Sequence, residues 1–166
     1  TYEVMEFLKK YKQAVIKPIY GNGGDGVFLL SKKDLNLNQI LESFLSLSKE
    51  PFMVQKYLPE ITRGDKRIIL INGKPVGAIA RVPKQNEIRS NIHVGGSAKK
   101  VSISKSDHAI CDAIGPELKK RKLFFVGIDI IGKYLTEINV TSPTCLIEIK
   151  KLSKVDIAKI IWNQLA

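Results

Sequence analysis

The sequence predicts an α+β protein, in which helices and antiparallel hairpins follow one another along the chain. Apolar residues recur at helical spacing in several segments, as in helices with one buried face. Two pairs of β-branched runs are joined by short turns that contain glycine, and a third pair flanks a run rich in glycine. With 166 residues and 44% hydrophobic content, the chain is long enough for one domain or a compact two-lobed unit.

Four segments are predicted helices. They span residues 2–11, 34–47, 107–122 and 156–165. In the second, the apolar residues fall on one face and Asp34 is a suitable N-terminal cap. In the last, Trp162 is expected to pack in the core.

The predicted strands lie between these helices. They cover residues 14–17, 27–30, 52–57, 67–71, 75–81 and the hairpin 124–140. Asn72-Gly73 lies between two apolar runs and is a strong hairpin signal. Residues 82–100 are polar and show no period, and a loop of that length inside a compact domain is functional or disordered.

The hairpin 127–143 carries three oxygen-bearing side chains. Glu137 and Asn139 alternate to one face of a strand, and a three-residue loop over Gly132–Tyr134 would place Asp129 opposite Glu137. Carboxylates on an apolar sheet are costly unless something neutralises them. Oxygen ligands of this kind suit Mg²⁺, which combines one or two carboxylates with substrate phosphates. The alternative is an edge hairpin with exposed acids.

The segment Gly21–Gly26 contains four glycines in six residues, with Lys17 on the strand before it. Its N–H groups can approach an anion without obstruction by a Cβ atom. A dinucleotide-binding fold would need a helix after the glycines, a Walker A loop needs Lys-Ser/Thr, and the kinase motifs are absent. A glycine hairpin over phosphates remains, and the alternative is a flexible turn.

The composition constrains the partners less sharply. A net charge of +11 attracts anions, whether nucleotide, acidic peptide or nucleic acid, although a solvated lysine-rich surface accounts for most of it. Two cysteines, Cys111 and Cys145, make no disulfide framework, and a cytoplasmic location is expected. No apolar run has the length of a membrane span, and no signal peptide is recognised.

The motifs together resemble the ATP-grasp domain of bacterial glutathione synthetases. The match runs over residues 14–149, and the run from Glu137 to Cys145 is its most specific part. The remaining motifs are Ile16-Lys17-Pro18 with the glycine loop, Gln55 to Pro59, Gly64 to Arg67, Ala80 to Pro83, Glu87 to Asn91 and Phe125 to Gly132. The resemblance implies two lobes with antiparallel sheets that clasp ATP, over residues 1–60 and 61–166, and a mobile lid over 82–98.

The resemblance also implies a role for each site residue. The residues implied to bind ATP are Lys17, Gly23, Gly24, Gln55, Lys56, Tyr57, Leu58, Asp65 and Lys66. Among them, Lys17 would bind phosphate, Gln55 to Leu58 would meet adenine, and Asp65 would take the ribose hydroxyls. Asp129, Glu137 and Asn139 would hold Mg²⁺, with Mn²⁺ as a second candidate. The residues implied in catalysis or substrate binding are Arg81 for the transferring phosphate, Arg67 for the acidic peptide, and Arg89, Asn91, Thr141 and Ser142.

The implied reaction joins γ-glutamylcysteine to glycine through an acyl phosphate, with ATP converted to ADP and phosphate. Full-length members carry an N-terminal substrate domain, which this sequence lacks, so we expect a fragment that by itself binds Mg-ATP weakly and catalyses little. A homo-oligomer stays open for the full-length enzyme, and neither nucleic acid nor membrane is an expected partner. Two alternatives are another ATP-grasp carboxylate-amine ligase and a non-enzymatic basic module that binds nucleotide or RNA; no stacking aromatic cluster supports RNA.

Overall fold

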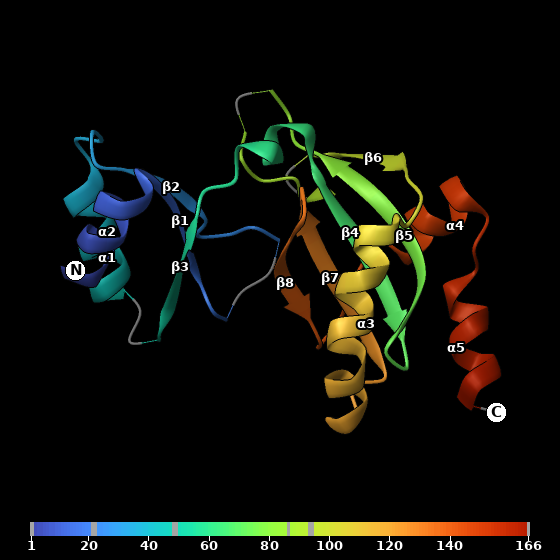
Figure 1. Cartoon of the computed structure of the whole chain (residues 1–166). Helices are drawn as coiled ribbons and strands as arrows, with labels where there is room; N and C mark the ends of the chain where they lie inside the picture. The colour runs from blue at the N-terminus through green and yellow to red at the C-terminus, as the bar shows by residue number, and fades with distance from the viewer. Residues whose placement is uncertain (1, 21–22, 48–49, 86, 93–94, 166) are drawn as a thin grey trace. The chain divides into compact units, whose positions relative to one another are not determined.

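The structure is a computed structural model that describes residues 2–20, 23–47, 50–85, 87–92 and 95–165 (Figure 1). The chain divides into two compact units, Thr1–Pro59 and Glu60–Ala166, and each is described here by itself. Both units combine helices with an antiparallel sheet. The predicted α+β class is therefore confirmed.

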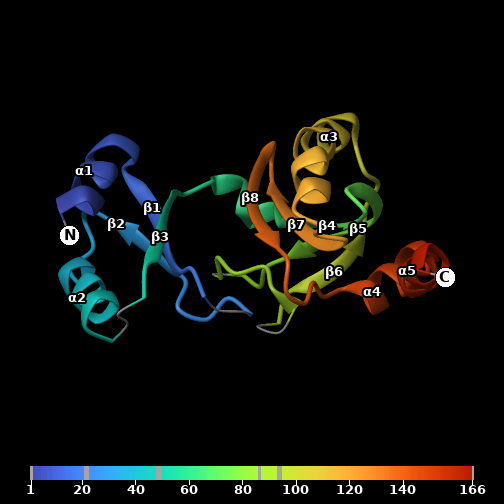
Figure 2. The ribbon, with the colours of Figure 1, turned by 90° about the horizontal axis from the view of Figure 1, so that it is seen from below.

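The first unit is a three-stranded sheet with two helices. Its elements are α1 (Tyr2–Tyr11), β1 (Gln13–Pro18), β2 (Phe28–Ser31), α2 (Leu37–Leu47) and β3 (Phe52–Lys56). The strand order is β2-β1-β3, with antiparallel neighbours. Both helices lie on the same side of the sheet (Figure 2). The core between them and the sheet contains Val4, Leu8, Ala14, Ile16, Leu30, Leu37 and Leu41.

Two local predictions can be compared with this unit. A strand, not a helix, follows Gly26 and pairs with β1, so a glycine hairpin is confirmed over its described part; Gly21 and Asn22 lie outside the described residues. Helix α2 begins at Leu37 instead of Asp34. The reason is local, because the Asp34 carboxylate accepts a hydrogen bond from the Asn36 N–H at 2.8 Å and so closes a turn before the helix.

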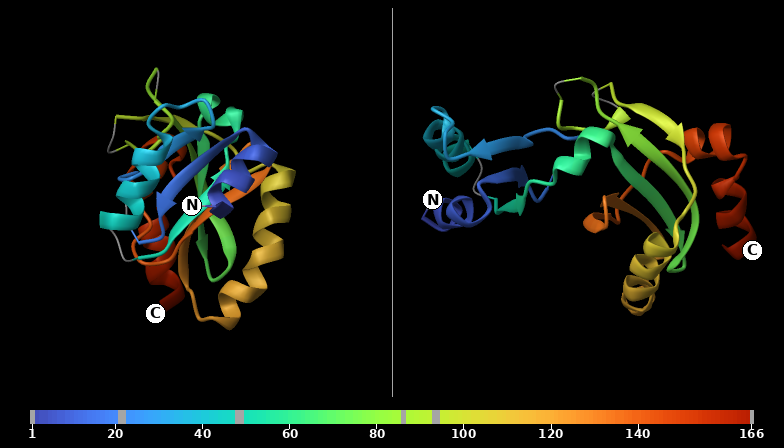
Figure 3. Two further views of the ribbon diagram at one scale, coloured as in Figure 1. Left: turned by 90° about the vertical axis from the view of Figure 1, so that its left-hand side faces the viewer. Right: turned by 45° about the horizontal axis from the view of Figure 1, so that its top comes forward.

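The second unit is a five-stranded antiparallel sheet in the order β6-β5-β4-β7-β8. Its elements are η1 (Pro59–Arg63, a 3-10 helix that begins at the boundary), β4 (Asp65–Ile71), β5 (Lys74–Val82), β6 (Ser97–Lys100), α3 (Lys105–Lys120), β7 (Phe125–Ile131), β8 (Tyr134–Asn139), α4 (Leu146–Ser153) and α5 (Ile157–Leu165). Helix α3 covers one face of the sheet, and α4 and α5 lie on the other (Figures 1 and 3).

The central strand β4 supplies apolar side chains to both faces. Ile68 and Leu70 pack into the core under α3, whereas Ile69 and Ile71 pack into the core against α4 and α5. A strand that is buried on both faces reads as a continuous apolar run, which explains the sequence Ile68 to Ile71. The residues at the start of the same strand are charged, and they build the candidate site.

The two hairpins of this sheet form as predicted, but with an irregularity in each. Asn72 and Gly73 have φ angles of +49° and +70°, which suit a tight two-residue turn. The predicted three-residue loop Gly132–Tyr134 is wrong, because Ile131 pairs directly with Tyr134. A one-residue bulge at Thr136 follows, and it restores the predicted pairing of Asp129 with Glu137. The Thr136 hydroxyl donates to the Asp129 carbonyl at 3.1 Å across this bulge.

Three further features differ from the sequence expectations. The polar run 82–100 ends in an edge strand, Ser97–Lys100, whose lysines are typical of a protected sheet edge. Helix α4 was not predicted, and it begins after Cys145 without a side-chain cap that could have signalled it. Trp162 is 70% exposed, so its expected place in the core is wrong. Of the helices in the described ranges, none combines the length and the apolarity needed to span a bilayer.

Candidate active site

Four charged side chains are buried together on the sheet face opposite α3. They are Asp65, Arg67, Arg81 and Asp129, which are 7%, 4%, 3% and 4% exposed. Asp65 pairs with Arg81 across β4 and β5, and Arg67 pairs with Asp129 across β4 and β7. Since paired residues and alternate residues share a face, all four side chains lie on one side. We call this group the arginine–aspartate cluster.

The hydrogen bonds within the cluster form one connected network. Arg67 donates from Nε and Nη2 to both carboxylate oxygens of Asp129, with Nη2 at 2.8 Å from Oδ2. Arg81 donates from Nε to Asp65 Oδ1 at 2.8 Å and from Nη2 to Asp65 Oδ2. The same Nη2 atom lies 2.9 Å from Asp129 Oδ2. Arg81 therefore bridges two aspartates, and Asp129 is shared by two arginines.

The cluster keeps its charges because each is compensated. Burial by itself would raise the pKa of Asp129, but the hydrogen bonds from Arg67 and the charge of Arg81 outweigh it, so that pKa lies below its ordinary value. Burial would likewise lower the pKa of Arg81, yet Asp129 and Asp65 raise it. Two guanidinium groups and two carboxylates thus make an ionised group with no net charge.

Two glycines provide the space that these long side chains need. A Cβ atom on Gly127 would lie 2.8 Å from Pro143 Cβ and 3.3 Å from Arg67 Cδ, so only glycine lets Arg67 lie flat against β7. Gly64 has a φ of +102°, and a Cβ atom there would lie 2.3 Å from the Arg81 carbonyl oxygen. Glycine at each of these two positions therefore allows the close packing of Arg67 and Arg81 in the cluster.

The predicted metal ligands share the face of the cluster. Glu137 pairs with Asp129 and Asn139 pairs with Gly127, so the three side chains project to one side of the β7–β8 hairpin as predicted. The Asn139 Nδ2 atom is buried and has no hydrogen-bond partner among the described residues. Turning the amide over would present an oxygen there instead.

These donors fit a divalent cation. No three His, Cys, Asp or Glu side chains within the described ranges form a metal-binding group, so two carboxylates and an amide would have to be completed from outside the protein. Phosphate oxygens are the usual complement of Mg²⁺ in such a site. The unpartnered Asn139 amide is an observation of this structure that agrees with a ligand arriving from outside.

Lys66 is not brought to the cluster, although the sequence placed it among the cofactor-binding residues. It precedes Arg67 on β4 and so points to the opposite face. There its ammonium group binds the Asp107 carboxylate and the Ser102 carbonyl, the latter at 3.3 Å. Asp65 lies in the cluster, where both of its oxygens accept from Arg81, and its expected contact with ribose is not tested by these contacts.

The polar segment 83–96 contains Arg89 and Asn91. Arg89 donates from Nη2 and Nε to the two oxygens of Glu87 at 2.7 and 3.1 Å. The hydrogen bond from Arg89, together with backbone N–H donors, lowers the pKa of Glu87 to about 2. The Asn91 carbonyl accepts from the Gly96 N–H at 3.1 Å, which folds the segment back on itself. The lid role of 82–98 remains a prediction.

The first unit carries the predicted nucleotide residues. Lys17 and Gln55 share the sheet face opposite α1 and α2 with three apolar neighbours, Val15, Leu29 and Met53. Lys56 alternates to the helix side, where its ammonium lies 5.8 Å from the centre of the Tyr11 ring. Tyr57 and Leu58 follow β3, and Gly23 and Gly24 have the positive φ angles of a tight turn.

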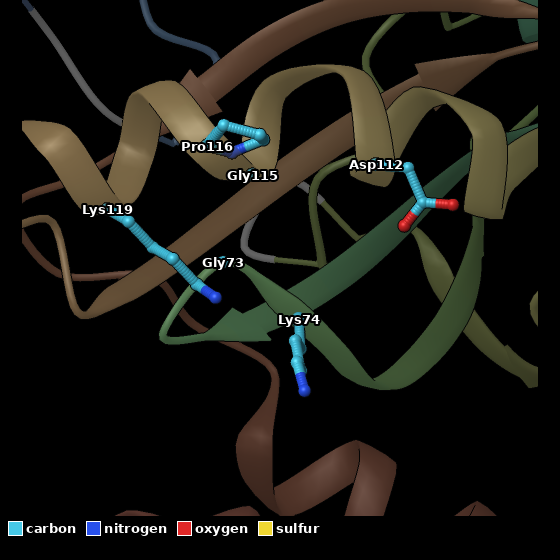
Figure 4. Close-up of a pocket in the computed structure, with 6 residues that line it drawn as sticks. All are labelled: Gly73, Lys74, Asp112, Gly115, Pro116 and Lys119. Carbon is cyan, nitrogen blue, oxygen red and sulfur yellow. The ribbon is translucent and has the colours of Figure 1, made fainter.

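Two other places complete the description of this unit. Thr141 and Ser142 are exposed between β8 and the buried Pro143. A surface pocket of about 360 Å³ lies between α3 and the β4–β5 turn, lined by Gly73, Lys74, Asp112, Gly115, Pro116 and Lys119 (Figure 4). It is formed by α3, the helix on the face away from the cluster, so we do not include it in the site.

Solved structures with a similar fold define the class of protein. The D-cycloserine synthetase DcsG aligns with a TM-score of 0.68 and 14% identity over 89% of this chain and 55% of its own. The ATP-grasp ligase PsnB, complexed with minimal precursor, Mg and ADP, gives 0.68 and 20% over 99% and 48%. A D-alanine–D-alanine ligase from Bacillus anthracis, complexed with ATP, gives 0.61 and 19% over 87% and 48%. The fold is that of the ATP-grasp ligases.

Sequence comparisons narrow the class to one family. The family model for the ATP-grasp domain of prokaryotic glutathione synthetase matches residues 1–154, and the chain belongs to this family. The glutathione synthetases of Mesorhizobium japonicum and Brucella melitensis are each 50% identical over 161 residues, which is 97% of this chain. Those alignments cover 51% and 52% of the relatives, so the chain spans about half the length of the curated relatives it matches.

The sequence named all four members of the arginine–aspartate cluster but did not predict the contact of Asp65 with Arg81 or that of Arg89 with Glu87. The contact of Asp65 with Arg81 depends on a strand register that is hard to read along the chain, whereas the Glu87–Arg89 contact is local. Counting back from the Asn72-Gly73 turn without a bulge would pair Arg81 with Gly64 and place it on the face of Lys66. The register shift between Ile69 and Leu70 instead pairs Arg81 with Asp65. The close approach of Gly64 to the Arg81 backbone cannot be recognised from the sequence around Gly64.

Proposed function

We propose that this chain is the ATP-grasp part of a glutathione synthetase-type ligase, which joins γ-glutamylcysteine to glycine while ATP is converted to ADP and phosphate. The observation that carries the proposal is the convergence of two arginines and three oxygen-bearing ligands on one sheet face, in a chain of this family. Cations and metal ligands side by side suit a reaction in which charge builds on phosphoryl oxygens.

In the second unit, oxygen-bearing side chains would bind the metal ion, and arginines would bind the phosphoryl group and the dipeptide. Asp129, Glu137 and Asn139 would hold Mg²⁺, with Mn²⁺ as the second candidate, and the ion would offset the charge of the phosphates. Arg81 would stabilise the transferring phosphoryl group, and Arg67 would bind a carboxylate of the dipeptide. A guanidinium suits both partners because it donates two parallel hydrogen bonds.

Residues of the first unit and of the polar segments would bind the remaining groups. Lys17, Gly23 and Gly24 would contact the phosphates, and the segment 55–58 would contact the adenine. Arg89 and Asn91, on the segment 83–96, would reach the substrates, together with Thr141 and Ser142. Closure of the segment 82–98 would exclude water, which otherwise hydrolyses an acyl phosphate.

The covalent steps follow from these assignments. The glycyl-accepting carboxylate of γ-glutamylcysteine attacks the γ-phosphorus of ATP, and the bond to the β–γ bridging oxygen breaks to release ADP. The glycine amine then attacks the acyl phosphate, phosphate leaves, and the amine loses a proton. The tetrahedral oxyanion and the leaving phosphate are both anionic, so fixed arginines stabilise them more than the reactants.

Calorimetry of ADP binding to the 166-residue chain tests the nucleotide step. We expect Mg²⁺ to tighten ADP binding, and we expect Glu137→Gln to remove most of that gain while magnesium-free binding stays the same. Glu117→Gln is the matched control, because Glu117 is an exposed carboxylate of α3 that pairs with Arg121. Equal loss in both variants, or binding that ignores Mg²⁺, would contradict the proposed metal ligands.

Substrate choice needs a second experiment, because relatives are about twice as long. The chain should be fused to the part of the Mesorhizobium japonicum relative that lies outside the match, and ADP release should be followed. We expect release only when γ-glutamylcysteine and glycine are both present. Release with D-alanine but not with this pair would replace the substrates and leave the ATP-grasp ligase class intact.

A further inference from the structure

Asp65 is the one member of the arginine–aspartate cluster to which the proposed reaction gives no task. It is 7% exposed, and both of its oxygens accept hydrogen bonds from Arg81. Each oxygen of Asp65 keeps a further lone pair, but the side chain is buried and its hydrogen bonds all serve to hold Arg81. Its neighbour Gly64 has a positive φ and meets the Arg81 backbone, so the chain is shaped to keep Asp65 beside Arg81.

The position of Arg81 matters because Asp129 is shared. Asp129 Oδ2 lies within hydrogen-bond distance of both Arg67 Nη2, at 2.8 Å, and Arg81 Nη2, at 2.9 Å. A divalent cation on the same carboxylate would compete with both guanidinium groups for its lone pairs. The like charges would also repel, and they would do so strongly in a buried site. An interaction that weakens the contact between Arg81 and Asp129 therefore favours binding of a divalent cation to Asp129.

Arg81 divides its donors unequally between the two aspartates. Nε and Nη2 both serve Asp65, and only Nη2 reaches Asp129. A bidentate contact is stronger and more directional than a single one. Without the Asp65 charge, the guanidinium would have Asp129 as its remaining anionic partner in the cluster, and it would turn onto that carboxylate.

We propose that Asp65 is a positioning residue, which anchors Arg81 and thereby leaves the Asp129 carboxylate accessible to a divalent cation. The inference rests on the proposed function, since it concerns the same metal site. It assigns Asp65 no contact with substrate and no part in the covalent steps. Its effect is transmitted through Arg81 alone.

The test is a Mg²⁺ titration of ADP binding in Asp65→Asn, with fluorescence or calorimetry as the readout. ADP is the probe because it lacks the γ-phosphate assigned to Arg81. We expect the Mg²⁺ concentration at half-maximal binding to rise about tenfold, which is the effect of one charge-assisted hydrogen bond. Binding of ADP without Mg²⁺ should not change.

Asp107→Asn is the matched control. Asp107 belongs to α3, is 2% exposed, and pairs with Lys66 of β4 on the opposite face of the sheet. Both variants should lower the melting temperature, because both remove a buried charge from an ion pair. Only Asp65→Asn should shift the Mg²⁺ midpoint, and an equal shift in both would overturn the inference.

A double variant covers the case in which Asp65→Asn fails to fold. Asp65→Asn combined with Arg81→Gln removes one charge of each sign and leaves no unpaired ion. Its Mg²⁺ midpoint should lie at or below that of the unaltered chain, and a higher midpoint would overturn the inference. If the unaltered chain showed no Mg²⁺-dependent ADP binding, the proposed function and this inference would both fall; if it did and Asp65→Asn matched it, only the inference would fall.

Discussion

Lys66 and Arg67 are consecutive residues of β4, and each binds a buried aspartate on its own face of the sheet. On the α3 face, Asp107 accepts from Lys66 and also closes the N-terminus of α3, where its Oδ2 atom accepts from the Ser104 N–H at 2.8 Å and from the Ser104 hydroxyl at 2.7 Å. On the other face, Asp129 accepts from two arginines, one of which, Arg81, also binds the Asp65 carboxylate.

The comparison distinguishes a structural ion pair, Lys66–Asp107, from a group of ion pairs around Asp129 that can form part of a binding site. Asp107 has partners from its own helix and one lysine, and burial, which would raise its pKa, is outweighed by the hydrogen bonds from Lys66 and Ser104. Such a capping box holds a helix end in place. Asp129 instead accepts from two arginine side chains of neighbouring strands, and its face of the β7–β8 hairpin also carries the exposed Glu137 and the unpartnered Asn139 amide. A ligand that approaches this face could replace one of the arginine contacts of Asp129, whereas the contacts of Asp107 hold the start of α3.

Asp129→Ala is expected to have the largest effect. It leaves two buried guanidinium groups with one carboxylate between them, and breaking a buried pair in this way costs about 3–5 kcal/mol. Mg²⁺-dependent ADP binding should also be lost. Urea denaturation and calorimetry measure the two effects, and a loss of stability below about 1 kcal/mol would show that the cluster is not coupled as its contacts indicate.

Asp107→Ala should come next, and it should act on stability alone. The change removes the side-chain half of a capping box and a charge-assisted hydrogen bond, which together are worth about 2–3 kcal/mol. ADP binding with Mg²⁺ should match that of the unaltered chain after correction for the folded fraction. A change in the metal dependence of binding would erase the distinction between the two faces.

Gly127→Ala tests whether the strand beneath Arg67 must lack a side chain at this position. The added methyl group would lie 2.8 Å from Pro143 Cβ and 3.3 Å from Arg67 Cδ. Overpacking of this kind costs about 1–3 kcal/mol. Thermal unfolding measures the cost, and a crystal structure of the variant should show Arg67 displaced from Asp129. An unchanged melting temperature would mean that Pro143 can move to accommodate the methyl group without loss of stability.

Glu87→Gln should have the smallest effect, because the Glu87 and Arg89 side chains are 26% and 31% exposed. The pair should contribute less than about 1 kcal/mol at neutral pH. Since the pKa of Glu87 is lowered from 4.5 to about 2, the contribution is fully present above pH 4.5 and is lost as the pH falls toward 2. Unfolding free energies of both proteins across this range should converge at the acid end; a constant difference would contradict the pairing.

Local chemistry made much of the fold predictable from the sequence. Helix α1 and the two hairpins of the second unit were predicted from apolar spacing and from Asn72-Gly73 and Gly132, because caps, turns and periodicity act over a few residues. The motifs likewise pointed to the ATP-grasp class. Helix α4 and the edge strand β6 were missed, since neither has a strong local signal and both form by packing against the sheet.

The strand registers at two places in the site depend on the tertiary structure. One extra residue on β5, Val76, shifts the β4–β5 register, and one on β8, Thr136, shifts the β7–β8 register. Each shift by one residue moves a side chain to the other face of the sheet, because strand side chains alternate. The sequence by itself predicted the charged residues of the strands and the pairing of Asp129 with Glu137, whereas the bulges, which depend on packing across the whole sheet, decided how that pairing is reached and brought Arg81 to Asp65.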